Sequence, residues 1–315
     1  MHGDEWLDHL QQEYLATFVR DGGASVKFVV GGAQQRADLQ HQLASAAEEA
    51  GYLVLSADSG EHRFHMPQDI FFAIARQVDW RATARRFILK LAEADGFRTE
   101  GVQAEQDDVF QSIAAGNEMD VPFLFTSLKP RFQRHVFYDR NMCKDFRIAM
   151  SHLCLLERSQ DLPYPGQPII DWLTGTNTRI SNVKPFSIYN PINRTTARHL
   201  LRSTVYWLHA AGYAGTVLIL DNSRVTERKR RDDGSRYYTR AMTIDHYELL
   251  REFIDSIDRF TSTLVVACSD VAFLDQEPDR QSRGLGIYPA LQTRIIDDVR
   301  DRRIQNPAAA LYRLA

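Results

Sequence analysis

The sequence predicts an α/β protein, a three-layer sandwich with a mainly parallel sheet and a largely helical insertion. The first observation is that short, continuously apolar segments alternate with helical patterns in the first and last thirds of the chain. Strands that are apolar on both faces are typical of parallel sheets covered by helices on each side. The second is that strand, turn, helix and strand follow one another early in the chain, which is the pattern of a βαβ unit.

In the first third, leucines at helical spacing, β-branched runs and glycine stops define each element. The pattern predicts helices over Glu5–Val19, Arg36–Ala50 and Gln68–Val78, and strands over Val26–Val30 and Tyr52–Leu55.

In the last third, the same signals predict helices over Thr195–Ala211 and Thr243–Ile257, and strands over Val217–Leu220 and Leu264–Cys268. Ligands of parallel sheets bind at the carboxyl ends of the strands. Gly31, Asp221 and Ser269 are therefore expected to lie at one edge of the sheet.

The middle of the chain is less regular. Helices are expected over Arg81–Ala94 and Cys143–Arg158, while prolines at positions 122, 130, 163, 165, 168, 185 and 191 are expected to interrupt any long element. The predicted organisation is a first half of the sheet domain over residues 1–79, a helical insertion over 80–194 and a second half over 195–315.

Composition excludes several classes of protein. The chain has 315 residues, a formal charge of −3 and 44% hydrophobic residues, which are globular values. No apolar run approaches the ~20 residues of a membrane helix, and no signal peptide is recognisable. Three cysteines without metal-ligand spacing fit a reducing compartment, so a cytoplasmic protein without a metal site is expected.

The turn after the first predicted strand resembles an altered phosphate-binding loop. Such a loop has the pattern G-x-x-x-x-G-K-[S/T], in which glycine amides and a lysine hold the phosphates and a hydroxyl binds magnesium. With Gly31 and Gly32 opening the turn, Arg36 takes the place of the second glycine, Ala37 that of the lysine and Asp38 that of the hydroxyl. A carboxylate near a helix N-terminus repels phosphate. An ordinary strand-to-helix turn, with Asp38 near the N-cap, is the favoured interpretation.

The strand Val217–Leu220 ends in Asp221 and Asn222, where ATPases with such loops carry Asp-Glu. Asp221 has the ligand chemistry for magnesium, but the neutral Asn222 is no general base. The pair has the pattern of a degenerate Walker B motif, in which neither residue is expected to be catalytic.

Four segments resemble the P-loop ATP-binding proteins of BREX-type phage-defence loci: Tyr14–Gly31, Ala211–Asp221, Leu250–Asp255 and Ile287–Ile295. The resemblance implies a P-loop NTPase-like, AAA+-type fold in an antiviral or DNA-directed complex. It also implies a sensor-like role for Ser269 and a role for Arg294 as an arginine finger toward a neighbour's nucleotide, although an exposed helix arginine is the commoner explanation.

The positive charge of the sequence is most concentrated in one predicted loop. Its residues are Arg228, Lys229, Arg230 and Arg231. Such a loop can hold nucleic-acid phosphates, but Asp232 and Asp233 follow it directly, so a solvated loop is the alternative. A weaker group of the same kind is Arg81, Arg85 and Arg86.

The leading hypothesis is a catalytically degenerate P-loop ATPase-like subunit that acts structurally or as a regulator in a phage-defence or DNA-processing complex. It needs no cofactor, and its expected partners are proteins, including an intact homologous ATPase. The first alternative is an active ATPase that binds ATP and magnesium through Arg36 or Lys27. The second is a DNA-binding module that uses the basic loop.

Overall fold

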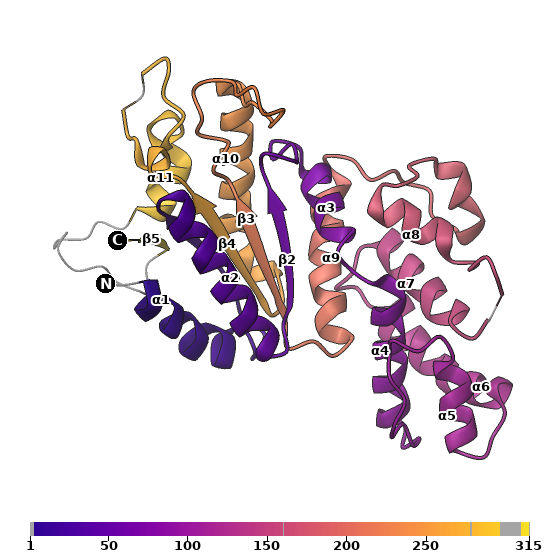
Figure 1. Cartoon of the computed structure of the whole chain (residues 1–315). Coiled ribbons are helices and arrows are strands. Elements are labelled where there is room, and N and C mark those ends of the chain that lie inside the picture. The colour runs from indigo at the N-terminus through magenta and orange to yellow at the C-terminus, as the bar shows by residue number, and fades with distance from the viewer. Residues whose placement is uncertain (1–2, 160, 278, 297–309, 315) are drawn as a thin grey trace. The chain divides into compact units, whose positions relative to one another are not determined.

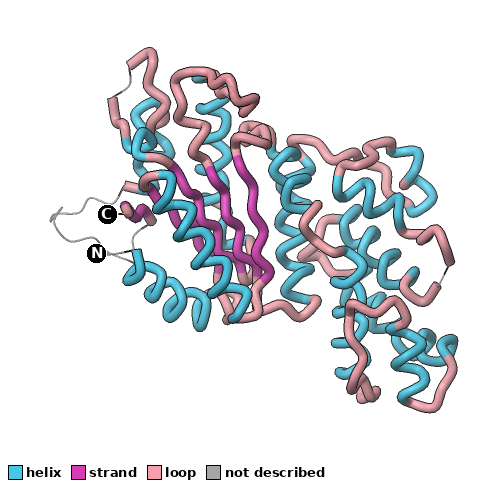
Figure 2. The backbone as a smooth tube through the Cα atoms, in the orientation of Figure 1, coloured by secondary structure: helices cyan, strands magenta, loops and turns pink. Residues whose placement is uncertain are grey.

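The computed structural model describes residues 3–159, 161–277, 279–296 and 310–314. The chain divides into two compact units (Figures 1 and 2). Unit 1 comprises Met1–Ala73 and Tyr213–Ala315, and unit 2 comprises Ile74–Gly212. Unit 2 is thus an insertion in the chain of unit 1.

Unit 1 is built on a parallel five-stranded sheet in the order β2-β3-β4-β1-β5. The strands are β1 (Ala24–Val30), β2 (Leu53–Asp58), β3 (Thr216–Asp221), β4 (Thr263–Ser269) and β5 (Leu311–Arg313). All residues of β4 and five of the six residues of β3 are buried, as expected for strands covered on both faces. The predicted fold class, a P-loop NTPase-like α/β fold with a parallel sheet, is confirmed.

Helices cover the two faces of this sheet. On one face, α1 (Gly3–His9), the π-helix η1 (Leu10–Phe18) and α2 (Ala33–Glu49) form a single apolar core with the strands, which includes Trp6, Leu43 and Val266. On the other face, Phe28 of β1 stacks on Phe273 of η6 (Val271–Leu274), which also contacts Tyr247 of α10 (Arg240–Asp255). The remaining elements of unit 1 are η5 (Ile257–Arg259), η7 (Leu285–Ile287) and α11 (Pro289–Ile295).

The helix expected over Glu5–Val19 is present but is not uniform. Its second half is the π-helix η1, and the Tyr52 hydroxyl donates a hydrogen bond of 2.5 Å to the carbonyl oxygen of Leu15 within it. Wider turns of this kind follow from side-chain packing and not from the hydrophobic period, so the sequence pattern does not distinguish them.

Unit 2 is helical, as predicted. Its elements are α4 (Trp80–Ala94), α5 (Val109–Gly116), α6 (Val121–Phe132), η2 (Gln133–Phe137), α7 (Lys144–Leu156), α8 (Gln167–Thr174), η3 (Ile180–Asn182), η4 (Lys184–Phe186) and α9 (Thr196–Ala210), while α3 (Pro67–Ala75) crosses the division between the units.

The boundaries of unit 2 differ from the predicted insertion over 80–194, because α9 belongs to the helical unit. The Trp207 indole packs against Phe87, with ring centroids 4.8 Å apart, and donates a hydrogen bond of 3.1 Å to Thr83 of α4. The apolar face of α9 is therefore buried within unit 2.

Two prolines that were expected to break helices are part of α6 instead. Pro122 lies in the first turn of α6, where backbone amides have no partner within the helix, so that a proline costs no helical hydrogen bond. Pro130 lies inside the helix, which continues directly into the π-helix η2. No helix among the described residues is both long and apolar enough to cross a membrane.

Candidate functional site

The turn between β1 and α2 has only two residues, Gly31 and Gly32, because α2 already begins at Ala33. The Gly32 amide donates to Gln35 Oε1 at 2.9 Å, and the Arg36 amide donates to the Gly32 carbonyl at 3.0 Å as the first helical bond. The helix was expected to begin at Arg36, which is wrong by one turn. Arg36, Ala37 and Asp38 therefore lie in the helix and do not form a loop.

Gly31 is enclosed by contacts from the chain itself. Its amide donates to the Ser269 carbonyl at 3.2 Å, and its carbonyl accepts from Arg36 Nη1 at 2.6 Å. A Cβ atom at Gly31 would lie 2.8 Å from Cβ of Leu314, the residue that follows β5. The absence of a side chain at Gly31 thus allows Leu314 to pack directly against the backbone of the turn.

Arg36 and Ser269 are almost completely buried, with 7% and 1% of their surfaces exposed. Arg36 Nε and Ser269 Oγ have no hydrogen-bond partner among the described residues. In contrast, Ala37 and Asp38 are exposed, and Asp38 accepts a hydrogen bond of 2.8 Å from Gln34 Nε2. The expectation that Asp38 lies near the N-cap is wrong, since that position is held by Gly32.

Asp221 ends β3 at the same edge of the sheet. Its Oδ1 accepts from the Ser223 amide at 2.8 Å, and its Oδ2 accepts from Gln40 Nε2 of α2 at 3.4 Å. Asp58 ends β2 directly beside it in register. Burial raises the pKa of Asp58, and the neighbouring carboxylates of Asp221 and Glu61 raise it further. Two carboxylates therefore meet at this edge of the sheet.

Asn222 faces the interior of unit 1. Its side-chain amide donates to the carbonyl oxygens of Leu220 at 3.0 Å and Cys268 at 3.4 Å. Its Oδ1 lies 2.6 Å from Nε2 of His246, whose Nδ1 lies 3.0 Å from the Phe64 carbonyl oxygen. Burial lowers the pKa of His246 to about 4. Asn222 thus holds β3, β4 and α10 together.

Lys27, the alternative phosphate contact, lies within β1 opposite Val266. Its Nζ lies 4.4 Å from the centroid of the Tyr14 ring in η1, and 3% of the residue is exposed. The lysine is therefore directed at the helical layer.

The basic loop contains its own counter-charges. Arg228 pairs with Asp275 at 2.9 Å, and Arg231 pairs with Glu227 at 2.7 Å. Lys229 and Arg230 are exposed and have no ion pair within the described part of the chain. Half of the loop's positive charge is therefore neutralised locally.

Arg294 lies in α11 and is bound by α10. Its Nε and Nη2 contact the two carboxylate oxygens of Asp255 at 2.5 and 3.0 Å, and its Nη1 donates to the Ala290 carbonyl. The finger-like role stays a prediction, and it requires these bonds to open.

Two arginines of the weaker basic group are not available for a partner. Arg81 and Arg85 bind the buried carboxylate of Glu157, at 2.9 and 2.5 Å, and 4% of Arg85 is exposed. The interpretation of these two residues as a nucleic-acid surface is wrong. Between residues 3 and 314, the described part of the chain holds no cluster of three His, Cys, Asp or Glu residues suited to a metal ion.

A comparison with family models gives one match, to the BREX system ATP-binding proteins BrxC/D, over residues 139–315. This range is more than half of the chain and includes β3, β4 and α10. The chain belongs to this family. The turn at Gly31 and the start of α2 lie outside the matched range. No curated protein and no solved structure matches the chain.

The nucleotide implied by the family does not match this edge of the sheet. A triphosphate needs a wide turn of free amides and a lysine. The edge offers a two-residue turn, a Gly31 amide bonded to Ser269, and Arg36 bonded to the turn's own carbonyl. These residues do not fit the group.

Several residues of this edge were not predicted from the sequence. Asp58 was missed because the strand was expected to end at Leu55. Extending the alternating pattern by three residues would have included it. Gln40, His246 and Leu314 carry no pattern of their own, since their contacts depend on how distant segments meet.

Proposed function

We propose that this BREX-family chain is a catalytically degenerate P-loop ATPase-like subunit that acts structurally or as a regulator in a phage-defence complex. The observation that supports this most is the two-residue turn after β1, in which Arg36 binds the Gly31 carbonyl and Leu314 packs against Gly31. A framework of this class without a phosphate cradle has lost the groups that hold ATP.

The altered strand end supports the same proposal. A carboxylate general base at position 222 would activate water, but an asparagine side chain has no basic group at neutral pH. Asn222 is 1% exposed and fully engaged with His246 and two backbone carbonyls. It is therefore a structural residue of the sheet edge.

Nucleotide binding to the purified full-length chain tests the proposal. Titration with fluorescent ATP and magnesium is expected to give no saturable binding below ~1 mM, a weak limit on the usual scale of affinities. Micromolar affinity that is lost in Asp221→Ala but kept in the matched strand-end variant Asp58→Ala would overturn the proposal. Such a result would establish the alternative, an ATP-binding subunit with unusual phosphate contacts.

The proposed partners are proteins, including an intact homologous ATPase that retains the lysine. In such a complex, Arg294 would contact the nucleotide bound to a neighbouring subunit after its ion pair with Asp255 has opened. Coexpression with an intact family member is expected to give a stable complex in size-exclusion chromatography. Arg294→Ala tests the finger by the ATPase rate of that complex. Arg259→Ala, which removes another exposed arginine of unit 1, is the control.

The DNA-binding alternative, which uses Arg228 to Arg231, receives less support because Asp275 and Glu227 neutralise two of its four cations. Charge reversal of Lys229 and Arg230 is the direct test. Salt-dependent DNA affinity that is unchanged in this variant would eliminate the loop as a binding site.

A further inference from the structure

Unit 2 carries a strongly basic region within an acidic chain. Residues 121–212 contain twelve Lys and Arg residues against five Asp and Glu residues, whereas the whole chain has a net charge of −3. Residues 172–220 contain no acidic residue at all. An excess of this size in one segment is the electrostatic pattern of a surface for a polyanion.

The few acidic side chains of this region are engaged within the unit. Glu157 is 1% exposed and binds Arg81 and Arg85. Asp145 is 9% exposed and accepts a hydrogen bond of 2.7 Å from Asn190, and Asp139 accepts from the Tyr206 hydroxyl at 2.7 Å. Among the described residues of unit 2, none of these three carboxylates forms an ion pair with Arg134, Arg140 or Lys144.

Three contacts bring the basic residues of η2, α7 and α9 together. The turn after η2 is tied to α9 by Tyr206, which contacts both Asp139 and Asn141. The start of α7 is tied to α9 by the Cys143 amide, which donates to Ser203 Oγ at 2.9 Å. Arg202 lies one turn from Tyr206 and next to Ser203, so α9 runs beside the turn that carries Arg140.

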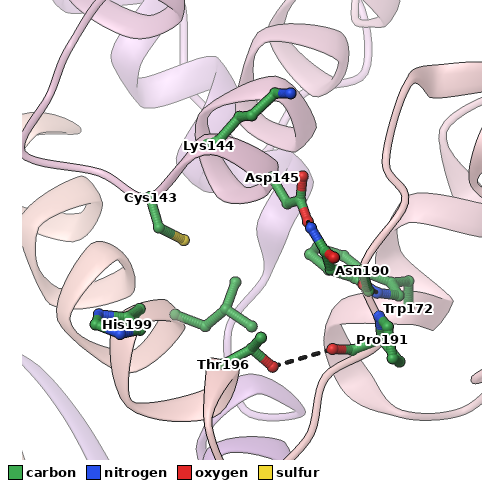
Figure 3. Close-up of a pocket in the computed structure, with 9 residues that line it drawn as sticks. Cys143, Lys144, Asp145, Trp172, Asn190, Pro191, Thr196 and His199 are labelled. Carbon is green, nitrogen blue, oxygen red and sulfur yellow. Dashed lines mark hydrogen bonds between the residues drawn. The ribbon is translucent and has the colours of Figure 1, made fainter.

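We define the basic surface of unit 2 as Arg134, Arg140, Lys144, His199 and Arg202, with the rings of Phe137 and Tyr138. None of these five basic residues has an ion pair within the parts of unit 2 that the structure describes. A cavity of about 150 Å³ opens between α7 and α9, and Lys144 and His199 line it together with Cys143 (Figure 3).

Two exposed aromatic rings lie between Arg134 and Arg140 in the chain. Phe137 and Tyr138 are 46% and 66% exposed, and their centroids are 5.2 Å apart at an angle of 84°. Adjacent rings of this size are normally buried, and exposed aromatic groups point to a binding surface. Rings between cations are the arrangement by which proteins stack unpaired bases and hold the connecting phosphates.

We propose that the basic surface of unit 2 binds single-stranded nucleic acid. Phe137 and Tyr138 stack on unpaired bases, while Arg134, Arg140 and Lys144 contact phosphates. This site is separate from the basic loop at Arg228–Arg231 in unit 1, and it does not depend on whether unit 1 binds a nucleotide.

The test is fluorescence anisotropy of the full-length chain with a labelled single-stranded DNA of mixed sequence, at two salt concentrations and without nucleotide. The double variant Arg134→Glu, Arg140→Glu is expected to lose at least tenfold in affinity. In a plot of log affinity against log salt concentration, the slope should also become shallower by about 1.4. Each phosphate that an arginine neutralises on a single strand contributes ~0.7 to this slope. The matched control Lys229→Glu, Arg230→Glu makes the same charge change in unit 1 and should bind like the wild type.

The rings are tested by Phe137→Ala, Tyr138→Ala, which should weaken single-strand binding about tenfold. Phe123→Ala, which removes another exposed ring of unit 2, should have no effect. Circular dichroism verifies that each variant is folded.

Four results would overturn the proposal. The first two are no binding by the wild type at low salt and loss of binding only in the unit 1 control. The other two are equal affinity for duplex DNA of the same sequence, and equal affinity for heparin together with no effect of the ring variant. The last result would identify a general polyanion surface and not a single-strand site. ATP titration is a separate measurement, so this failure is distinguishable from failure of the proposed function.

Discussion

The carboxyl edge of the sheet in unit 1 and the basic surface of unit 2 treat their polar groups in opposite ways. At the sheet edge, Arg36, Asn222 and Asp221 are bound to neighbouring groups of the same unit. On the helical unit, Arg134 and Arg140 are exposed and have no ion pair within its described residues. The edge where this fold class normally binds its ligand is therefore occupied largely by internal contacts, whereas the arginines of the basic surface of unit 2 stay exposed.

The comparison requires that arginines with a structural role in unit 2 be distinguished from arginines that are exposed for binding. The substitution that tests this distinction has the largest expected effect on stability. Glu157→Gln should lower the free energy of unfolding by about 3–5 kcal/mol, because it removes the buried counter-charge of Arg85 and leaves this buried arginine only the exposed carboxylate of Asp107. Urea denaturation measures the loss.

The matched control is Asp107→Asn, which alters a carboxylate that contacts the same two arginines but is 78% exposed. It should change stability by less than ~1 kcal/mol. Equal effects of the two substitutions would mean that Glu157 does not form a buried ion pair, and Arg81 and Arg85 would again count as surface cations.

The structural role of Asn222 and His246 predicts sensitivity to acid. Burial lowers the pKa of His246 to about 4, below the ~6.5 of a free histidine, so the unfolded chain binds more protons between these values. Stability from this group is complete above pH 6.5 and is lost as the pH falls toward 4. The expected contribution is roughly 3 kcal/mol.

Urea denaturation of the wild type and His246→Gln at pH 7 and pH 4.5 measures this term. The variant should be less stable at pH 7 but lose less stability on acidification. Identical losses in both proteins would show that His246 does not titrate in this window, and the network with Asn222 would need another explanation.

The paired carboxylates at the ends of β2 and β3 give the smallest expected effect. The pKa of Asp58 is raised by burial and by Asp221, so its stabilising contribution is present below its unfolded pKa and is lost as the pH rises through the folded value. Asp58→Asn should therefore raise the melting temperature by about 1–2 °C at pH 7.

The gain from Asp58→Asn should disappear near pH 3, where the wild-type carboxyl is already neutral. Asp258→Asn, the same substitution at an exposed residue of η5, is the control and should leave the melting temperature almost unchanged. A gain that persists at pH 3 would assign the effect to packing and not to charge.

The architecture of unit 1 was largely predictable from the sequence because its signals are local. The run Val217–Leu220 indicates a buried strand wherever it pairs, and Leu39 and Leu43 mark the buried face of α2. The strand order could not be predicted in this way, because it depends on how the connections between strands cross the sheet and not on local sequence signals. The short strand β5 has only three residues and carries no periodicity.

The candidate site was less predictable, for two physical reasons. The eight-residue motif pattern assumes a loop, but Gln35 accepts a hydrogen bond from the amide of the cap residue Gly32 and the helix begins early, so that the same residues take helical positions. In unit 2, Pro130 indicated a broken segment, yet the helix continues through it and brings Arg134 and Phe137 to the surface.

The pairing of β1 with β5 has a consequence for synthesis of the protein. Phe28 pairs with Leu311, and Leu314 closes over Gly31, across almost the entire length of the chain. While the ribosome is still producing unit 2, β1 has neither β4 nor β5 beside it and exposes an unsatisfied backbone edge. Its apolar sequence then depends on α1, α2 or a chaperone for protection, so translation speed through unit 2 should influence the yield of soluble protein.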